Sequence, residues 1–192
     1  MQSTTRRRLL KLGLGGGVLL GIGGVWAFFD SSDELPLEVK RSLRVLSPRE
    51  YLVIQAISKR LFREGDSSSP RSPFPDPVVV DVGARVDAFL RSLEAQDQRD
   101  FKRLLQLCEH LFPWLAGHFG RFTKLSGDAQ DAVLRAMERS SFGVLRGAFQ
   151  VVKSVCALAY FSSPATWAAI GYDGPLVNRP AGGWTRRVDG VE

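Results

Sequence analysis

Four neighbouring side chains, those of Cys108, Glu109, His110 and His118, form the one group in this 192-residue chain whose types suit a metal site. Thiolate, imidazole and carboxylate groups are the usual protein ligands of zinc. The spacing argues against such a site, because residues two apart on a helix point about 200° apart and His118 lies beyond Pro113. A core cysteine and two partly exposed histidines explain these residues, so we expect no metal site.

Other patterns that carry chemistry are missing from the sequence. It contains no Cys-x-x-Cys-His for covalent haem, no Gly-x-Ser-x-Gly turn and no phosphate-binding loop. Four aspartates, Asp97, Asp100, Asp128 and Asp131, lie near expected helix starts, where a carboxylate stabilises the helix dipole without any catalytic role. We therefore expect no catalytic residue and no bound cofactor in this chain.

The two cysteines, Cys108 and Cys156, lie on apolar faces of different expected helices. Three states fit this placement: a disulfide within the chain, two buried free thiols, or a bridge from Cys156 to a partner chain. The sequence does not rank them.

An arginine pair near the N-terminus stands in the pattern Thr5-Arg6-Arg7-x-Leu9-Leu10-Lys11. An uncharged stretch with seven glycines follows, from Leu12 to Phe29. This combination is typical of a twin-arginine export signal, which a translocase receptor reads and which moves proteins that are already folded. The expected signal residues are Arg6, Arg7, Leu9, Leu10 and Lys11. An ordinary signal peptide and a plain membrane anchor are the alternatives.

The same stretch is long enough to stay in a membrane, because it would measure roughly 27 Å as a helix. Its one small-residue cleavage pattern is Val25-Trp26-Ala27. Cleavage after Ala27 and retention as an anchor both stay open. Either outcome places the rest of the chain in the periplasm or on the periplasmic face of the inner membrane.

The net charge of +6 owes much to this N-terminal segment. It contains four of the 26 basic residues and no acidic one, so the remainder carries 22 basic against 20 acidic side chains. That balance is weak support for binding nucleic acid, and we expect no such partner.

The remaining sequence reads as helices separated by polar breaks. Ser47, Pro48 and Glu50 form a capping box with proline at the first helical position, and an apolar stripe then runs to about Arg63. A loop with four prolines is expected over 64–77. Further apolar stripes predict helices near 82–93, 101–115, 126–137 and 142–161, with Pro113 bending or dividing its element. The fold class is therefore all-α, a single compact helical bundle.

The expected organisation has four parts: a signal or anchor over 1–29, a linker over 30–45, an all-α domain over 46–175 and an irregular tail over 176–192. The segment 142–161 is the most apolar of the domain and is expected to be central or covered by a partner. Arg146 and Lys153 interrupt it, which disfavours a membrane crossing.

Aromatic residues gather directly after this helix, where Ser163 and Pro164 predict a short helix that ends at Gly171. Exposed tyrosine and tryptophan side chains are the usual anchors of protein interfaces. The candidate partner interface consists of Tyr160, Phe161, Trp167, Ile170 and Tyr172. The competing interpretation places Trp167 in the core.

Several short motifs, in this order, resemble the gluconate 2-dehydrogenase subunit 3 family. They are Leu46-Ser-Pro-Arg-Glu-Tyr51, Ala56-Ile57, Arg60-Leu61-Phe62, Val86-Asp87-x-Phe89-Leu90, Phe119-Gly120-Arg121-Phe122, Leu125-Ser126, Tyr160-Phe-Ser-Ser-Pro-x-x-Trp167 and Ile170-Gly-Tyr172. Each motif is weak alone, and their order carries the resemblance. One departure is the serine- and proline-rich stretch from Asp66 to Pro77, where the family pattern has a proline soon after the first helix.

The resemblance implies a non-catalytic all-α accessory subunit without a prosthetic group. Its partner would be a large FAD-containing dehydrogenase of the glucose-methanol-choline type, often joined by a multihaem cytochrome c. The large subunit would oxidise a sugar, sugar acid or alcohol, while the small one escorts it through twin-arginine export and stabilises it. A stand-alone exported enzyme and a solitary membrane-anchored helical domain are the alternatives.

Overall fold

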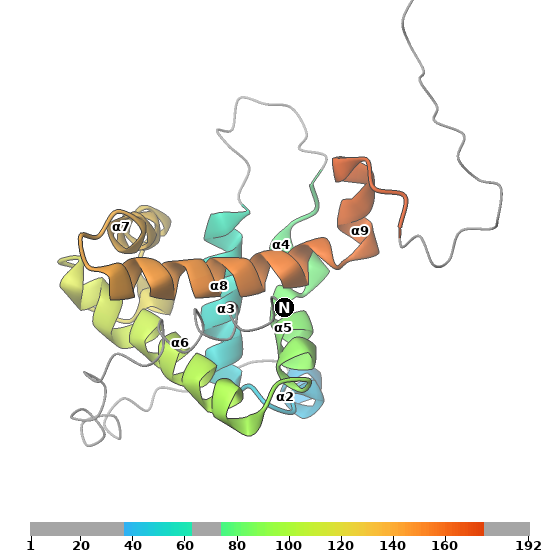
Figure 1. Cartoon of the computed structure of the whole chain (residues 1–192), viewed down its shortest axis with the longest axis horizontal. Helices are drawn as coiled ribbons and strands as arrows, with labels where there is room; N and C mark the ends of the chain where they lie inside the picture. The colour runs from blue at the N-terminus through green and yellow to red at the C-terminus, as the bar shows by residue number, and fades with distance from the viewer. Residues whose placement is uncertain (1–36, 63–73, 175–192) are drawn as a thin grey trace, which may run out of the picture.

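The computed structural model describes residues 37–62 and 74–174, and every regular element within these ranges is helical. The expected all-α class is therefore confirmed. The elements, drawn in Figure 1, are α2 (Leu37–Ser42), α3 (Pro48–Leu61), α4 (Pro77–Val80), α5 (Val82–Leu90), α6 (Ala95–Leu115), η3 (Phe122–Lys124), α7 (Gly127–Glu138), α8 (Gly143–Phe161), α9 (Pro164–Trp167) and η4 (Ala168–Ile170). The expected signal segment 1–29 and tail 176–192 lie outside the described residues.

Helix α3 begins at the capping box that the sequence predicts. The Ser47 hydroxyl accepts a hydrogen bond from the Glu50 backbone N–H, and the Glu50 carboxylate accepts one from the Ser47 N–H at 2.7 Å. Pro48 occupies the first helical position, where no N–H is needed. Ser126 caps α7 in the same way, through the Ala129 N–H.

Helix α3 lies at the centre of the bundle. It contacts α4, α5, α6, α7 and α8, while α8 also packs along α5 and α7. Figure 1 shows α8 crossing over α3 along the length of the domain. Helix α8 is therefore a core helix on one side, and its other side is left for solvent or a partner.

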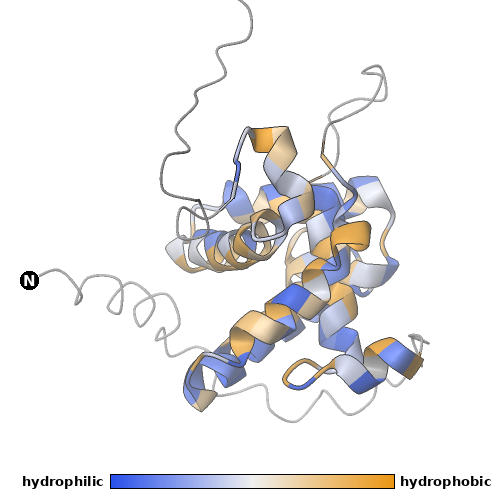
Figure 2. Cartoon of the chain, turned by 90° about the vertical axis from the view of Figure 1, so that its right-hand side faces the viewer, coloured by the Kyte–Doolittle hydropathy of each residue, from blue (hydrophilic) through white to orange (hydrophobic). Residues whose placement is uncertain are grey.

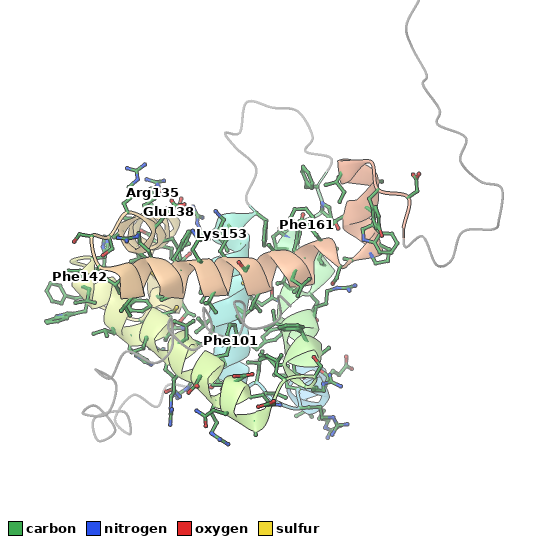
Figure 3. The ribbon with its side chains drawn as sticks, in the orientation of Figure 1. Phe101, Arg135, Glu138, Phe142, Lys153 and Phe161 are labelled. Carbon is green, nitrogen blue, oxygen red and sulfur yellow. The ribbon has the colours of Figure 1, made fainter. Side chains whose placement is uncertain are left out.

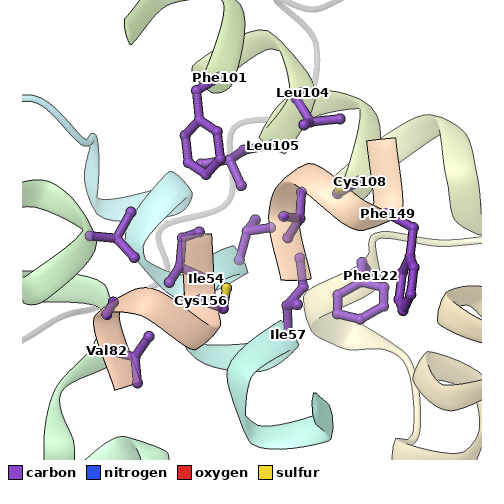
Figure 4. Packing of buried hydrophobic residues seen from close by; sticks show 14 of the residues in the cluster. Ile54, Ile57, Val82, Phe101, Leu104, Leu105, Cys108, Phe122, Phe149 and Cys156 are labelled. Atoms are coloured by element: carbon purple, nitrogen blue, oxygen red, sulfur yellow. The ribbon is translucent and has the colours of Figure 1, made fainter. Parts of the chain in front are cut away.

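The core forms where these helices meet. Ile54 and Ile57 of α3 lie among Val82 of α5, Leu105 of α6 and Cys156 of α8 (Figure 4). Apolar and polar residues alternate along the ribbons of the helices, as Figure 2 shows, because each helix buries one face and exposes the other.

A single aspartate joins α4 to α5. Asp81 adopts a left-handed conformation, with φ of 52°, and its carboxylate accepts hydrogen bonds from the Ala84 N–H at 3.1 Å and the Tyr51 hydroxyl at 2.9 Å. Gly83 allows the close packing of this junction, because a Cβ at that position would lie 2.5 Å from the Tyr51 ring. The end of α4 and the start of α5 are thereby held against α3.

The expected linker is structured in its second half. Residues Leu37–Ser42 form α2, and the segment that follows is bound to the bundle by Asp87 of α5. The buried Asp87 carboxylate accepts hydrogen bonds from the backbone N–H groups of Arg44 at 3.2 Å, and of Val45 and Leu46 at 2.8 Å each. The packed domain therefore begins before residue 46, at Arg44 or earlier.

The structure decides part of one further expectation and corrects another. Of the two outcomes expected at Pro113, division of the helix is wrong, because α6 continues two residues further, to Leu115, and the Pro113 carbonyl accepts the N–H groups of Ala116 and His118 that close its end. The loop expected over 64–77 ends one residue early, since Pro77 is the first residue of α4 and Asp76 caps it through the Val78 N–H at 2.7 Å. Residues 63–73 of that loop lie outside the described ranges.

Candidate partner-binding surface

The short helix α9 is fastened to the end of α8 by a buried threonine. The Thr166 hydroxyl donates a hydrogen bond to the carbonyl oxygen of Ser163 at 2.8 Å and lies 3.3 Å from that of Tyr160. Pro164 begins the helix, and Gly171, with φ of 64°, ends η4. The predicted short helix is confirmed, and it holds the following aromatic residues in fixed positions.

Tyr160 is a core residue, so the expectation that it lies at the interface is wrong. Its side chain is only 1% exposed, its ring stacks on Phe62 with centroids 4.4 Å apart, and its hydroxyl donates to the carbonyl of Pro75 at 2.6 Å. Burial raises the pKa of Tyr160, and the charge of Asp76 raises it further. Successive residues of a helix point about 100° apart, so Tyr160 turns inward while Phe161 turns outward.

Phe161 lies at the surface, with 38% of its area exposed. Its ring makes edge contacts with those of Phe62, Tyr160 and Phe74, at centroid distances of 5.9, 5.1 and 6.5 Å. Phe74 precedes α4 and is itself exposed. The sequence analysis missed Phe74, because nothing local in a proline-rich stretch indicates that it meets the end of α8.

Trp167 is half-buried, which places it between the two interpretations that the sequence allows. Its indole N–H donates to the carbonyl of Phe161 at 3.1 Å, and its ring meets the Tyr172 ring edge-on at 5.2 Å. Gly174 lies so close that a Cβ there would be 3.1 Å from the indole. Trp167 therefore supports the exposed side chains of Ile170 and Tyr172.

Four exposed side chains and the half-buried Trp167 make up an apolar set around α9, which we call the α9 patch: Phe74, Phe161, Trp167, Ile170 and Tyr172. Val78 and Val79 of α4 are exposed as well. The segments 74–80 and 154–174 contain two acidic residues, Asp76 and Asp173, and no basic one. Such a surface can bury apolar area against a partner.

The cysteines are two buried free thiols, which decides among the three states left open by the sequence. Burial raises the pKa of Cys156 to about 12, although a hydrogen bond with Ser58 opposes the shift. Burial likewise raises the pKa of Cys108, with the charges of Cys156 and Glu109 adding to it. Because Cys156 has no exposed surface, it cannot reach a partner chain in this fold.

No group of three or more metal-binding side chains occurs within residues 37–62 and 74–174. Cys108 lies in the core, and Glu109 accepts hydrogen bonds from the backbone N–H and the hydroxyl of Thr123, at 3.0 and 2.6 Å. His110 is half-buried on another side of α6, where burial lowers its pKa and the charges of Arg121 and Arg49 lower it further.

Helix α8 is the one helix of the described ranges long and apolar enough, by length and composition alone, to cross a membrane. Its Phe149, Val152 and Cys156 pack in the core of the domain. Only 28% of its apolar window is buried, so α8 packs in the core along one face and leaves the rest uncovered within the described residues. The expected signal residues, from Arg6 to Lys11, lie outside the described residues.

The described part of the chain is thus an all-α domain with exposed aromatic side chains at the end of α8. The model of the family described as gluconate 2-dehydrogenase subunit 3 matches residues 48–174, and the chain belongs to this family. A member of this family is a subunit of a complex with other gluconate dehydrogenase subunits. No curated protein and no solved structure matches the chain.

Proposed function

We propose that this chain is the accessory subunit of an exported flavin-dependent dehydrogenase, which it binds through the α9 patch and escorts through the twin-arginine translocase. The large subunit carries FAD and oxidises a sugar, sugar acid or alcohol. The chain itself holds no prosthetic group and performs no catalytic step. The complex works in the periplasm or on the periplasmic face of the inner membrane, where a multihaem cytochrome c can accept its electrons.

One observation carries this proposal: a family of dehydrogenase subunits matches a domain that has exposed apolar side chains around α9. The arginine pair at Arg6 and Arg7 supports the export step, since the twin-arginine route moves folded proteins. A chain without a cofactor of its own needs a route for folded proteins only if it carries a cofactor-bearing partner with it. That partner would be encoded by a neighbouring flavoprotein gene that lacks a signal of its own.

The proposal is tested by copurification of the two subunits. The substitutions Ile170→Asp and Tyr172→Ser remove exposed apolar contacts, and a hot-spot loss of about 2 to 4 kcal/mol would weaken binding by roughly 30- to 1000-fold. The matched control replaces Phe142 and Val144 by serine, because both are exposed at the opposite end of α8.

We expect both double variants to melt close to the wild type, because surface substitutions change stability little. The α9-patch variant should lose the large subunit, and the control should retain it. Full copurification of the α9-patch variant would show that the flavoprotein binds elsewhere.

A further inference from the structure

A second group of exposed apolar residues lies at the other end of α8. Phe119 is 85% exposed and Phe142 is 71% exposed, the two most exposed aromatic side chains of the described part of the chain. Trp114, Leu115 and Val144 are also exposed. We call the end of the domain that these five residues mark the basic tip, because the charged residues in the same segments are basic, as described below.

The five residues come from two segments that leave the core side by side. Phe122, which follows Phe119 in the chain, and Phe149, which follows Phe142 on α8, lie next to each other in the core (Figure 4). The end of α6 and the turn from α7 into α8 reach the same end of the bundle (Figure 1). Figure 3 shows Phe142 at this end of α8 and Phe161 at the other.

The charged residues of the two segments that form the tip are basic. Residues 113–124 and 139–146 contain four basic residues, Arg121, Lys124, Arg139 and Arg146, and no acidic one. The neighbouring Glu138 pairs with Lys153 at 3.9 Å (Figure 3). The charged residues in the segments of the α9 patch are the acidic Asp76 and Asp173, so the two apolar surfaces differ in the charge beside them.

Exposed tryptophan and phenylalanine side chains among arginines match the interface of an anionic bilayer. Aromatic rings sit at the level of the lipid headgroups, apolar tips enter the acyl boundary, and each nearby arginine or lysine is attracted by anionic lipid. The carboxylates of Asp76 and Asp173, beside the α9 patch, would be repelled there. We propose that the basic tip binds the surface of an anionic phospholipid bilayer, with Trp114, Phe119 and Phe142 entering the headgroup region.

This arrangement separates the two surfaces by the length of α8. Nineteen residues span about 28 Å, so a bilayer at the basic tip and a protein at the α9 patch would not compete for space. The inference goes beyond the escort role and does not depend on it. It uses the proposed location only for the choice of lipid.

The test measures which tryptophan meets the lipid. The full chain contains Trp26, Trp114, Trp167 and Trp184, so two variants with phenylalanine at the other three positions keep either Trp114 or Trp167 alone. Each is mixed with phosphatidylcholine vesicles that contain phosphatidylglycerol and acyl chains with bromine, which quenches tryptophan on contact. Any binding through the N-terminal segment affects both variants alike, so the comparison reports the orientation of the domain.

We expect the bromolipid to quench Trp114 and to leave Trp167 unchanged. Equal quenching of both residues, or of neither, overturns the proposal. If the large subunit shields Trp114 from solvent and the bromolipid does not quench its fluorescence, the basic tip is a protein interface. That result would also overturn the proposal. None of these outcomes depends on the escort role, since copurification tests that role separately.

A second measurement leaves every tryptophan in place. In vesicle flotation, Arg139→Gln should weaken binding of the full chain to anionic vesicles about fivefold, the effect of one charge at such a surface. The double variant Phe119→Ser, Phe142→Ser should weaken it further, whereas the matched control Ile170→Ser, Tyr172→Ser should not. Equal flotation of all these variants contradicts the proposal.

Discussion

Arg60 of α3 and Asp131 of α7 form a two-pronged ion pair, with Nε to Oδ1 at 2.7 Å and Nη2 to Oδ2 at 2.6 Å. Both side chains are half-buried, with 9% of the Arg60 and 21% of the Asp131 side chain exposed, and the hydrogen bond to Asp131 raises the pKa of Arg60. Gly127 at the start of α7 leaves room for the guanidinium, since a Cβ there would lie 2.6 Å from its Nη1. This pair joins the central helix to α7.

The substitution Gly127→Ala should therefore destabilise the domain by about 1 to 2 kcal/mol, because a Cβ would push the Arg60 guanidinium out of its two-pronged contact with Asp131. The control is Gly147→Ala on α8, where a Cβ meets nothing within 4 Å and alanine should stabilise the helix by up to about 1 kcal/mol. Urea unfolding of both variants measures the difference. Equal stability of the two would show that the ion pair is unimportant.

The Asp87 carboxylate predicts a loss of stability in acid. Burial alone would raise its pKa, but the N–H groups of Leu46, Val45 and Arg44, together with the charge of Arg91, lower it below the ordinary value of 3.8. A lowered pKa in the folded state means that the carboxylate stabilises the fold fully above about pH 4, its unfolded value. That contribution should decline as the pH falls below 4 toward the folded pKa.

The substitution Asp87→Asn should cost about 2 kcal/mol of unfolding free energy at pH 7, and the gap to the wild type should narrow at pH 3. Asp97→Asn serves as the control, since Asp97 is exposed in the first turn of α6 and its loss should cost well under 1 kcal/mol. Urea unfolding at both pH values gives the comparison. If the difference in unfolding free energy between Asp87→Asn and the wild type is the same at pH 7 and pH 3, the charge of Asp87 does not stabilise the fold in this way.

The two thiols should stay reduced in the exported protein. The thiolate is the reactive form of cysteine, and burial raises the pKa of both Cys108 and Cys156 far above neutral pH. Thiol titration of protein isolated from the periplasm should find neither cysteine reactive in the native state and both reactive in denaturant. A disulfide in the isolated protein would show that the core opens during or after export.

The sequence predicted the features that depend on neighbouring residues. The capping box of Ser47 and Glu50, and the short helix from Pro164 to Gly171, follow from side chains within a few positions of one another. Helix α2 has no such local signal, because a six-residue segment with three charges shows no apolar stripe.

Contacts between distant segments were not predictable in this way. The sequence places Asp131 near a helix start and so suggests only an interaction with the helix dipole. Its partner in the structure, Arg60, lies 71 residues earlier in the chain. The groups that bind Asp87 are backbone N–H groups, which leave no mark on the sequence. Tyr160 and Phe161 are equally aromatic, and only the direction in which α8 packs makes one of them core and the other surface.

The central claim is that this chain carries a flavoprotein through the twin-arginine translocase, and the location of that flavoprotein tests it most directly. In cells that express both subunits, the double change Arg6→Lys, Arg7→Lys should leave the FAD-containing large subunit in the cytoplasm, because lysine does not reproduce the planar guanidinium pair. Arg8→Lys, just outside the pair, should leave it in the periplasm. A large subunit that still reaches the periplasm with the double-lysine variant would contradict the account.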